Sequence, residues 1–215
     1  MVLDPMANMP PLPWLFRDVT RDWTITLSQD TFGLETRSYA GFDDFRARFE
    51  RLSEALVEHI VPTLSTRIGL RFLDELRPLD RPKVSAQSAE GGLRPIQWDD
   101  VVCPEMLGIA GLPMFQGRIQ QSLQQLALRD DNGVGLNINH GIVPAGSLID
   151  PPSAGAKEFG QLSFYALDID AFQEFGRGRE IAVSPSGILG RLDAFHDAIS
   201  KIFRWSLKED HLDSL

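Results

Sequence analysis

Two aspartates near the end of a predicted strand are the first candidates for chemistry. Asp168 and Asp170 stand two positions apart in the stretch 167–170, which reads LDID. Side chains at i and i+2 of a strand point to the same side of a sheet, so the two carboxylates could share a metal ion. With His140 or His196 nearby, they would form a catalytic metal site. The alternative is that both aspartates end the strand, where they stay solvated or accept backbone N–H groups in a turn.

The histidines also have an ordinary structural interpretation. His140 lies on the apolar side of a predicted strand and His196 on the apolar side of a predicted helix. Half-buried imidazoles at such positions commonly make hydrogen bonds within the core. His59 sits near a predicted helix end, where a cation suits the dipole, and His211 falls in a tail that is predicted to fray.

Two arginines form another candidate site. Arg67 and Arg71 share the polar side of a predicted strand, with Gly69 between them, and could bracket an anion there. Salt bridges to Glu35 or to acidic residues on neighbouring strands explain the same arrangement. Both alternatives stay open from the sequence: an anion site or an ion-pair site.

Motifs for nucleophilic, phosphate-binding or metal chemistry are missing. The chain has no G-x-S-x-G, no G-x-x-x-x-G-K-[ST], no H-E-x-x-H and no G-x-G-x-x-G. Its single cysteine, Cys103, precedes a proline and has no neighbouring base in the sequence, which favours an inert buried thiol. One cysteine permits neither an intrachain disulfide nor a cysteine-based zinc site. We therefore expect no cofactor, and an enzyme is less expected than a binding protein.

The elements that would position these residues follow from hydrophobic periodicity. Alternating segments predict strands at 23–27, 32–39, 67–73, 119–129, 134–143 and 161–169. The fourth and fifth are joined by a loop ending in Asn132-Gly133, which is a strong hairpin signal. Helical periodicity predicts amphipathic helices at 41–60 and about 186–207, the second capped by Ser184 or Ser186. The order ββαβ, then βββα, predicts an α+β fold: an antiparallel sheet of about six strands packed by two long helices.

Two stretches interrupt this pattern. Residues 1–20 are rich in proline, which removes backbone donors and blocks helix formation, so they are predicted to form an extended arm. Residues 77–117 show weak periodicity, with one short helical candidate at 101–109. Loops this long tend to be functional or mobile, so we expect a partner-binding surface in this excursion. Residues 21–210 are predicted to form a single domain around it.

Charge and hydropathy limit the partners. The formal net charge of −9 would repel nucleic-acid backbones and anionic bilayers, and it suits either solubility alone or the steering of a basic protein partner. The first residues lack the pattern of a secretory signal, and nowhere do 18 apolar residues run together. The chain is therefore expected to be cytoplasmic, with no nucleic-acid or membrane partner.

Three segments resemble a sporadically distributed bacterial protein family of unknown function. They are 34–45 (LETRSYAGFDDF), 67–73 (RIGLRFL), and 167–170 (LDID) followed by 192–203 (LDAFHDAISKIF). The R-I-G-L-R-[FY]-[IL] core is the most specific of them. The resemblance implies no catalytic residue. The patchy distribution of that family suggests mobile genes, including toxin–antitoxin, immunity and antiphage modules.

These observations lead to three functional hypotheses. The first is a non-catalytic interaction protein, antitoxin-like, immunity-like or part of an antiphage defence system, which binds the product of a neighbouring gene through its acidic surface and residues 77–117. The alternative is a metal-dependent hydrolase or small-ligand enzyme using Asp168, Asp170 and His140. The third is a homo-oligomer that pairs through an exposed strand edge.

Overall fold

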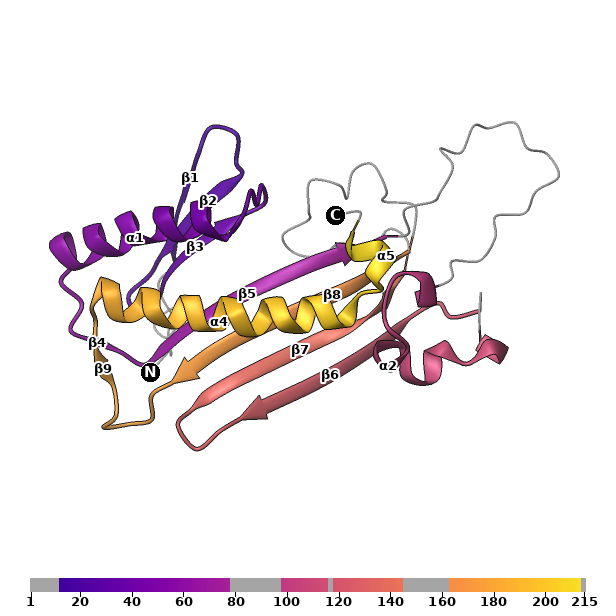
Figure 1. Cartoon of the computed structure of the whole chain (residues 1–215). Coiled ribbons are helices and arrows are strands. Elements are labelled where there is room, and N and C mark those ends of the chain that lie inside the picture. The colour runs from indigo at the N-terminus through magenta and orange to yellow at the C-terminus, as the bar shows by residue number, and fades with distance from the viewer. Residues whose placement is uncertain (1–11, 78–97, 116–117, 145–162, 214–215) are drawn as a thin grey trace, which may run out of the picture.

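The computed structural model describes residues 12–77, 98–115, 118–144 and 163–213 (Figure 1). Within these ranges the fold is mixed α+β, with nine strands in three antiparallel sheets. The strands are β1 (Trp14–Arg17), β2 (Trp23–Leu27), β3 (Phe32–Thr36), β4 (Leu64–Ser65), β5 (Arg67–Leu76), β6 (Ser122–Arg129), β7 (Val134–Val143), β8 (Phe164–Glu174) and β9 (Ile181–Ala182). The α-helices are α1 (Phe42–His59), α2 (Pro104–Leu107), α4 (Pro185–Ser206) and α5 (Glu209–Leu212).

The largest sheet has four strands in the order β5-β8-β7-β6. The predicted hairpin is confirmed, because β6 and β7 pair on either side of the loop that contains Asn132 and Gly133. Gly133 has φ +77, and a Cβ at this position would lie 2.1 Å from the carbonyl oxygen of Glu174. The turn therefore requires glycine for its backbone conformation and for the close approach of β8.

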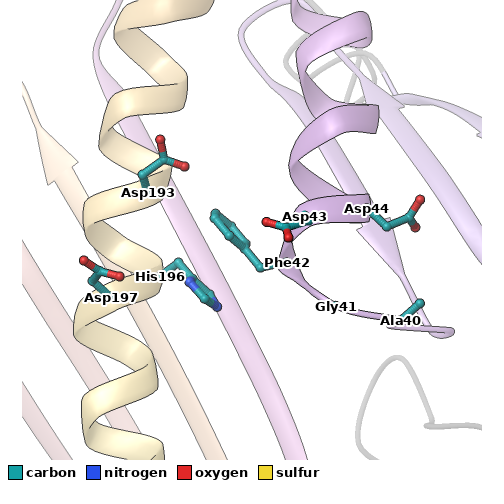
Figure 2. A pocket seen from close by; sticks show the side chains of 8 residues that line it. All are labelled: Ala40, Gly41, Phe42, Asp43, Asp44, Asp193, His196 and Asp197. Carbon is teal, nitrogen blue, oxygen red and sulfur yellow. The ribbon is translucent and has the colours of Figure 1, made fainter.

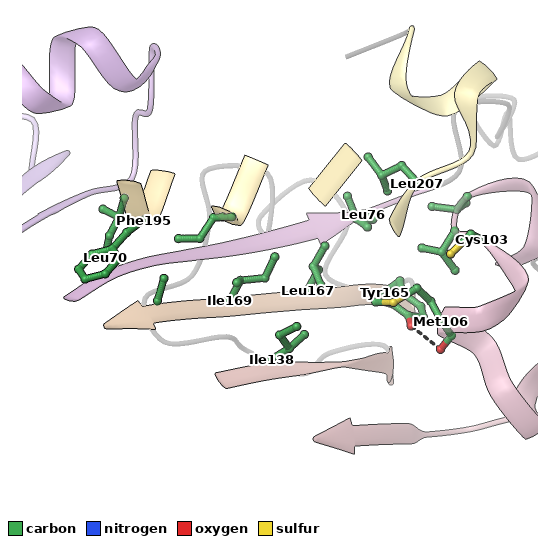
Figure 3. Packing of buried hydrophobic residues seen from close by; sticks show 14 of the residues in the cluster. Leu70, Leu76, Cys103, Met106, Ile138, Tyr165, Leu167, Ile169, Phe195 and Leu207 are labelled. Carbon is green, nitrogen blue, oxygen red and sulfur yellow. Dashed lines mark hydrogen bonds between the residues drawn. The ribbon is translucent and has the colours of Figure 1, made fainter. Parts of the chain in front are cut away.

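Helix α4 covers the half of this sheet formed by β5 and β8 (Figure 1). It begins where the Ser184 hydroxyl accepts a hydrogen bond from the N–H of Gly187, with Pro185 in the first turn. Its apolar stripe includes Leu192 and Phe195, which are buried against strand residues such as Ile169 (Figure 3). This layer of helix on sheet forms the main core.

Helix α1 packs on the second sheet, which has the order β1-β2-β3, and it also contacts α4. Phe45 of α1 stacks on Trp23 with ring centroids 6.1 Å apart, and Phe49 contacts Phe32 at 5.8 Å. The third sheet is the short pair of β4 and β9. Two residues of the Phe-rich stripe that predicted this helix, Phe45 and Phe49, therefore face a small sheet separate from the large one.

Residues 98–107 complete the core near the C-terminal end of α4 and the first residues of β8. Val101 and Val102 are buried, and Val102 forms an isolated antiparallel bridge with Leu207 just after α4. The Tyr165 hydroxyl donates to the carbonyl of Met106 at 3.0 Å (Figure 3). Helix α2 is preceded by the 3₁₀ helix Trp98–Asp100. It is followed by two further 3₁₀ helices, Gly108–Gly111 and Pro113–Phe115.

The fold differs from several predictions made from the sequence. The described residues form three sheets instead of the one that was predicted, because the described strands before α1 pair with each other and not with the large sheet. Residues 14–17 of the predicted arm form β1, which pairs with β2 once the prolines have ended. Part of the described excursion is core, since Val101, Val102, Cys103, Met106 and Leu107 are buried near the C-terminal end of α4; residues 78–97 and 116–117 lie outside the described residues. His211 is buried in α5, where a frayed tail was predicted.

Candidate functional site

Arginines of β5 pair with aspartates of β8 on the face of the large sheet turned away from α4. Arg71 binds the Asp168 carboxylate through Nε and Nη2, at 2.6 and 2.9 Å. Arg67 places Nη2 2.8 Å from Oδ2 of Asp170. Asp168 also accepts an amide N–H from Asn139 of β7 at 3.2 Å. The carboxylates that were candidate metal ligands are thus neutralised by guanidinium groups.

Gly69 provides the space in which Arg67 reaches its partner. A Cβ at Gly69 would lie 3.1 Å from Nη1 of Arg67. The same guanidinium lies over the buried ring of Phe172, with its central carbon 4.9 Å from the ring centroid. An anion site and ion pairs were both open for these arginines, and the structure shows ion pairs with the aspartates of β8.

His140 lies on the opposite face of the sheet from these aspartates. In the strand register His140 faces Leu167, whose side chain points away from the side occupied by its neighbour Asp168. The Nδ1 of His140 lies 2.7 Å from the Tyr165 hydroxyl, and burial lowers the pKa of the imidazole. The hypothesis of a metal site joining His140 to Asp168 and Asp170 is therefore wrong, because the pleat separates them.

His196 lies on α4, apart from both His140 and the two aspartates of β8. Its ring stacks on Phe42 with centroids 3.8 Å apart and an interplanar angle of 2°. Its Nε2 lies 3.2 Å from the Ser200 hydroxyl oxygen. Within 12–77, 98–115, 118–144 and 163–213, no three His, Cys, Asp or Glu side chains are grouped as a metal ion requires.

A pocket of 540 Å³ opens where α1 begins beside α4 (Figure 2). We call it the α1–α4 notch. Its lining residues are Ala40, Gly41, Phe42, Asp43, Asp44, Asp193, His196 and Asp197. Figure 2 shows the rings of Phe42 and His196 between the two helices, with the carboxylates around them. Gly41 starts α1 with φ 141 and ψ 162, a conformation that favours glycine.

The four carboxylates of the notch divide into two kinds. Two are neutralised by arginines of α1, through the pairs Asp193–Arg46 at 2.7 Å and Asp44–Arg48 at 3.0 Å. Asp43 and Asp197 make no hydrogen bond or salt bridge with any residue that the structure describes, although the charge of Asp43 contributes to the raised pKa of Arg46. The notch therefore offers two carboxylates that have no salt-bridge partner among the described residues, beside an aromatic surface.

No family model matches this chain, and neither a curated protein nor a solved structure matches it. None of the described helices combines the length and the apolar character needed to cross a bilayer. The assignment of a function consequently depends on the geometry of the site.

Asp74 is a titratable residue near the notch that sequence reasoning missed. It lies on the α4 side of β5, between Phe72 and Leu76, and burial raises the pKa of its carboxyl to about 6. Tyr39 touches Phe72 edge-on at 5.2 Å; burial raises the pKa of its phenol, and the charge of Asp74 raises it further. The predicted strand stopped at Leu73, so the alternation that places Asp74 on the apolar face was not followed far enough.

Proposed function

We propose that the protein is a non-catalytic interaction component, antitoxin-like, immunity-like or part of an antiphage defence system. Its partner is a protein encoded by a neighbouring gene, which inserts a basic side chain into the α1–α4 notch. The observation that carries this proposal is a pair of carboxylates, Asp43 and Asp197, that have no salt bridge to a described residue and lie in a pocket with an aromatic wall.

The chemistry of the notch fits arginine or lysine. A guanidinium forms strong charge-assisted hydrogen bonds with carboxylates, and Phe42 supplies a ring for cation–π contact. Asp44 and Asp193 add their charges, although Arg48 and Arg46 offset these. The net charge of −9 steers a basic partner towards the chain before contact is made.

Parts of the three segments that carry the family resemblance meet at this place, whereas Asp168 and Asp170 point to the other face of the large sheet. Tyr39 and Phe42 belong to the first segment, Phe72 to the second and His196 to the last. Their rings form one chain of contacts: Tyr39 on Phe72, Phe72 beside His196 at 6.1 Å, and His196 on Phe42. This convergence supports a shared purpose for the segments, which lie far apart in the sequence.

A second contact area extends the proposed interface. The part of the predicted excursion after α2 exposes Ile109, Leu112 and Met114, with exposed fractions of 72%, 44% and 68%. Clusters of exposed apolar side chains are typical of protein-binding surfaces. We expect this segment to contribute apolar contact while the notch provides charge selectivity.

The test is co-expression of the tagged chain with each adjacent gene product, followed by calorimetric titration of the complex that forms. The variant Asp43→Asn with Asp197→Asn removes the two free charges of the notch. The matched control, Glu54→Gln with Glu58→Gln, removes two exposed charges from the same helix α1 outside the notch. We expect the notch variant to bind about tenfold more weakly or worse, because each charged hydrogen bond contributes about 1.5–3 kcal/mol.

The control variant is expected to retain nearly wild-type affinity. An equal loss in both variants would show that overall charge, and not the notch, recognises the partner. If no adjacent gene product forms a complex with the chain, the proposed function is wrong.

A further inference from the structure

Strand β6 forms an edge of the large sheet that no described strand covers. It has eight residues and pairs only with β7 among the described strands. Its sequence, SLQQLALR, contains no proline, lysine or acidic residue. Leu123, Leu126 and Leu128 are exposed by 62%, 48% and 51%. Natural sheets usually protect such edges with charges, proline or short strands, so a long apolar edge is a template for another strand.

The opposite edge of the same sheet is built differently. Strand β5 carries four charged side chains in ten residues, namely Arg67, Arg71, Asp74 and Glu75. On β6 the one charged residue, Arg129, is already paired with Glu174 at 2.8 Å. Charged side chains thus protect the edge at β5, and the side chains of β6 do not provide this protection.

The hydrogen-bonding pattern shows which backbone N–H and C=O groups of β6 point away from β7. The N–H of Asp130 donates to the carbonyl of Val134 at 2.8 Å, which makes these two residues a hydrogen-bonded pair. By alternation, the even-numbered residues of β6 bond to β7. The backbone groups of Leu123, Gln125 and Ala127 therefore point outward from the sheet.

We propose that β6 pairs with β6 of a second copy of this chain, in antiparallel register about a two-fold axis at Leu126. The result is one continuous eight-stranded sheet. The proposal does not depend on the proposed function, because it concerns a different surface and a different partner.

The distribution of charge favours a second copy of this chain as the partner of β6. Two chains that each carry −9 repel one another over most of their surfaces, but β6 contains no negative charge. An approach along β6 therefore brings no carboxylates of the two strands together. A basic partner gains nothing from this edge, whose only charge is positive.

The symmetric register is also self-consistent. A two-fold axis perpendicular to a sheet pairs residues of the same parity, so apolar side chains stay on the same face in both copies. The register through Leu126 pairs Gln125 with Ala127, whose backbone groups both point outward. It sets Arg129 opposite Leu123, so no like charges meet. Leu126 faces itself in a pair without hydrogen bonds, where side chains approach most closely.

The first experiment tests this register by cysteine cross-linking of the full chain. At the axis, Leu126→Cys would bring two Cα atoms to about 4.5 Å, within the range that a disulfide spans. The matched variant Leu128→Cys is equally exposed, but its two copies would be about 13 Å apart along the strands. The native Cys103 is buried, so the wild type should not cross-link and serves as a control. Under mild oxidation we expect a linked dimer from Leu126→Cys alone.

The second experiment measures association by sedimentation over a concentration series. We expect the purified wild type to be a dimer, and Leu126→Lys to be a monomer because two ammonium groups would face each other at the axis. Leu64→Lys, on β4 with 58% exposure, is the control and should stay dimeric. Far-UV circular dichroism verifies that each variant is folded, and cross-linking remains informative if the lysine variant is not. A monomeric wild type, or faster cross-linking at 128 than at 126, overturns the proposal.

Discussion

Arg71 faces Asp170 across the β5–β8 register, yet its guanidinium binds Asp168, one pleat further along. The shift leaves Asp170 to Arg67, so each aspartate has its own arginine. The Asp168 side chain is only 13% exposed, whereas that of Arg71 is 59% exposed. A nearly buried carboxylate is therefore compensated by a cation that lies largely at the surface.

Replacing Arg71 by methionine is expected to destabilise the protein by about 1–3 kcal/mol, because Asp168 would keep only its bond from Asn139. Urea unfolding of the variant and the wild type measures the difference. Glu50→Gln, which breaks an exposed pair with Arg46 at 3.6 Å, is the control and should change little. An Arg71→Met variant as stable as this control would contradict the compensating role.

Asp74 predicts a pH dependence of stability. Its folded pKa of about 6 lies above the ordinary value of 3.8, so the folded state binds more protons than the unfolded state between these values. Stability contributed by this group is therefore fully present below about pH 4 and is lost as pH rises through about 6. Asp74→Asn should unfold at higher urea concentration than the wild type at neutral pH, by on the order of 1–2 kcal/mol.

The advantage of Asp74→Asn should shrink as the pH falls, because the wild-type carboxyl is then protonated. Urea unfolding of both proteins at several values between about pH 4 and pH 7 measures the trend. A difference that stays constant over this range would show that burial does not perturb Asp74.

Two glycines on the long helices should respond in opposite ways to alanine. Gly41→Ala is expected to cost about 1–3 kcal/mol, because φ 141 disfavours any side chain. Gly190→Ala, in an exposed turn of α4 with open space around it, is expected to gain about 0.5–1 kcal/mol. Thermal unfolding of both variants tests this. Equal effects at the two sites would mean that the backbone conformation at Gly41 is not required.

The Tyr165 hydroxyl links three segments of the core. It lies 2.7 Å from Nδ1 of His140 and donates to the carbonyl of Met106. Tyr165→Phe should lower the free energy of unfolding by about 1–2 kcal/mol, since the imidazole is left buried without this partner. Tyr39→Phe is the control, because the Tyr39 hydroxyl makes no hydrogen bond to a described residue. Similar losses in both variants would exclude a specific contribution from this link.

Local patterns predicted the elements that depend on local chemistry. The stripe through Leu192 and Phe195 predicted the residues that α4 buries, and one of the two proposed caps, Ser184, is observed. The Asn132-Gly133 signal located the hairpin because a positive φ at this turn needs glycine. These features depend on residues that lie within a few positions of each other.

Features that depend on distant contacts were missed. Val101 and Val102 have no periodic context, and their burial follows from the bridge to Leu207 on the far side of the chain. The notch was not predicted because it needs the packing of α1 against α4. His196 was considered as a metal ligand or a core residue, and only the structure shows its ring against Phe42.

The pairing of β5 with β8 also has a consequence for synthesis on the ribosome. Arg71 and Asp168 are 97 positions apart, so β5 emerges long before the only strand that pairs with it in the described sheet. Until then its alternating apolar side chains are exposed on the nascent chain, and loop closure must precede any stabilising contact. The four charges of β5 oppose association of this unpaired strand with other chains, a purpose that they serve before the protein has folded.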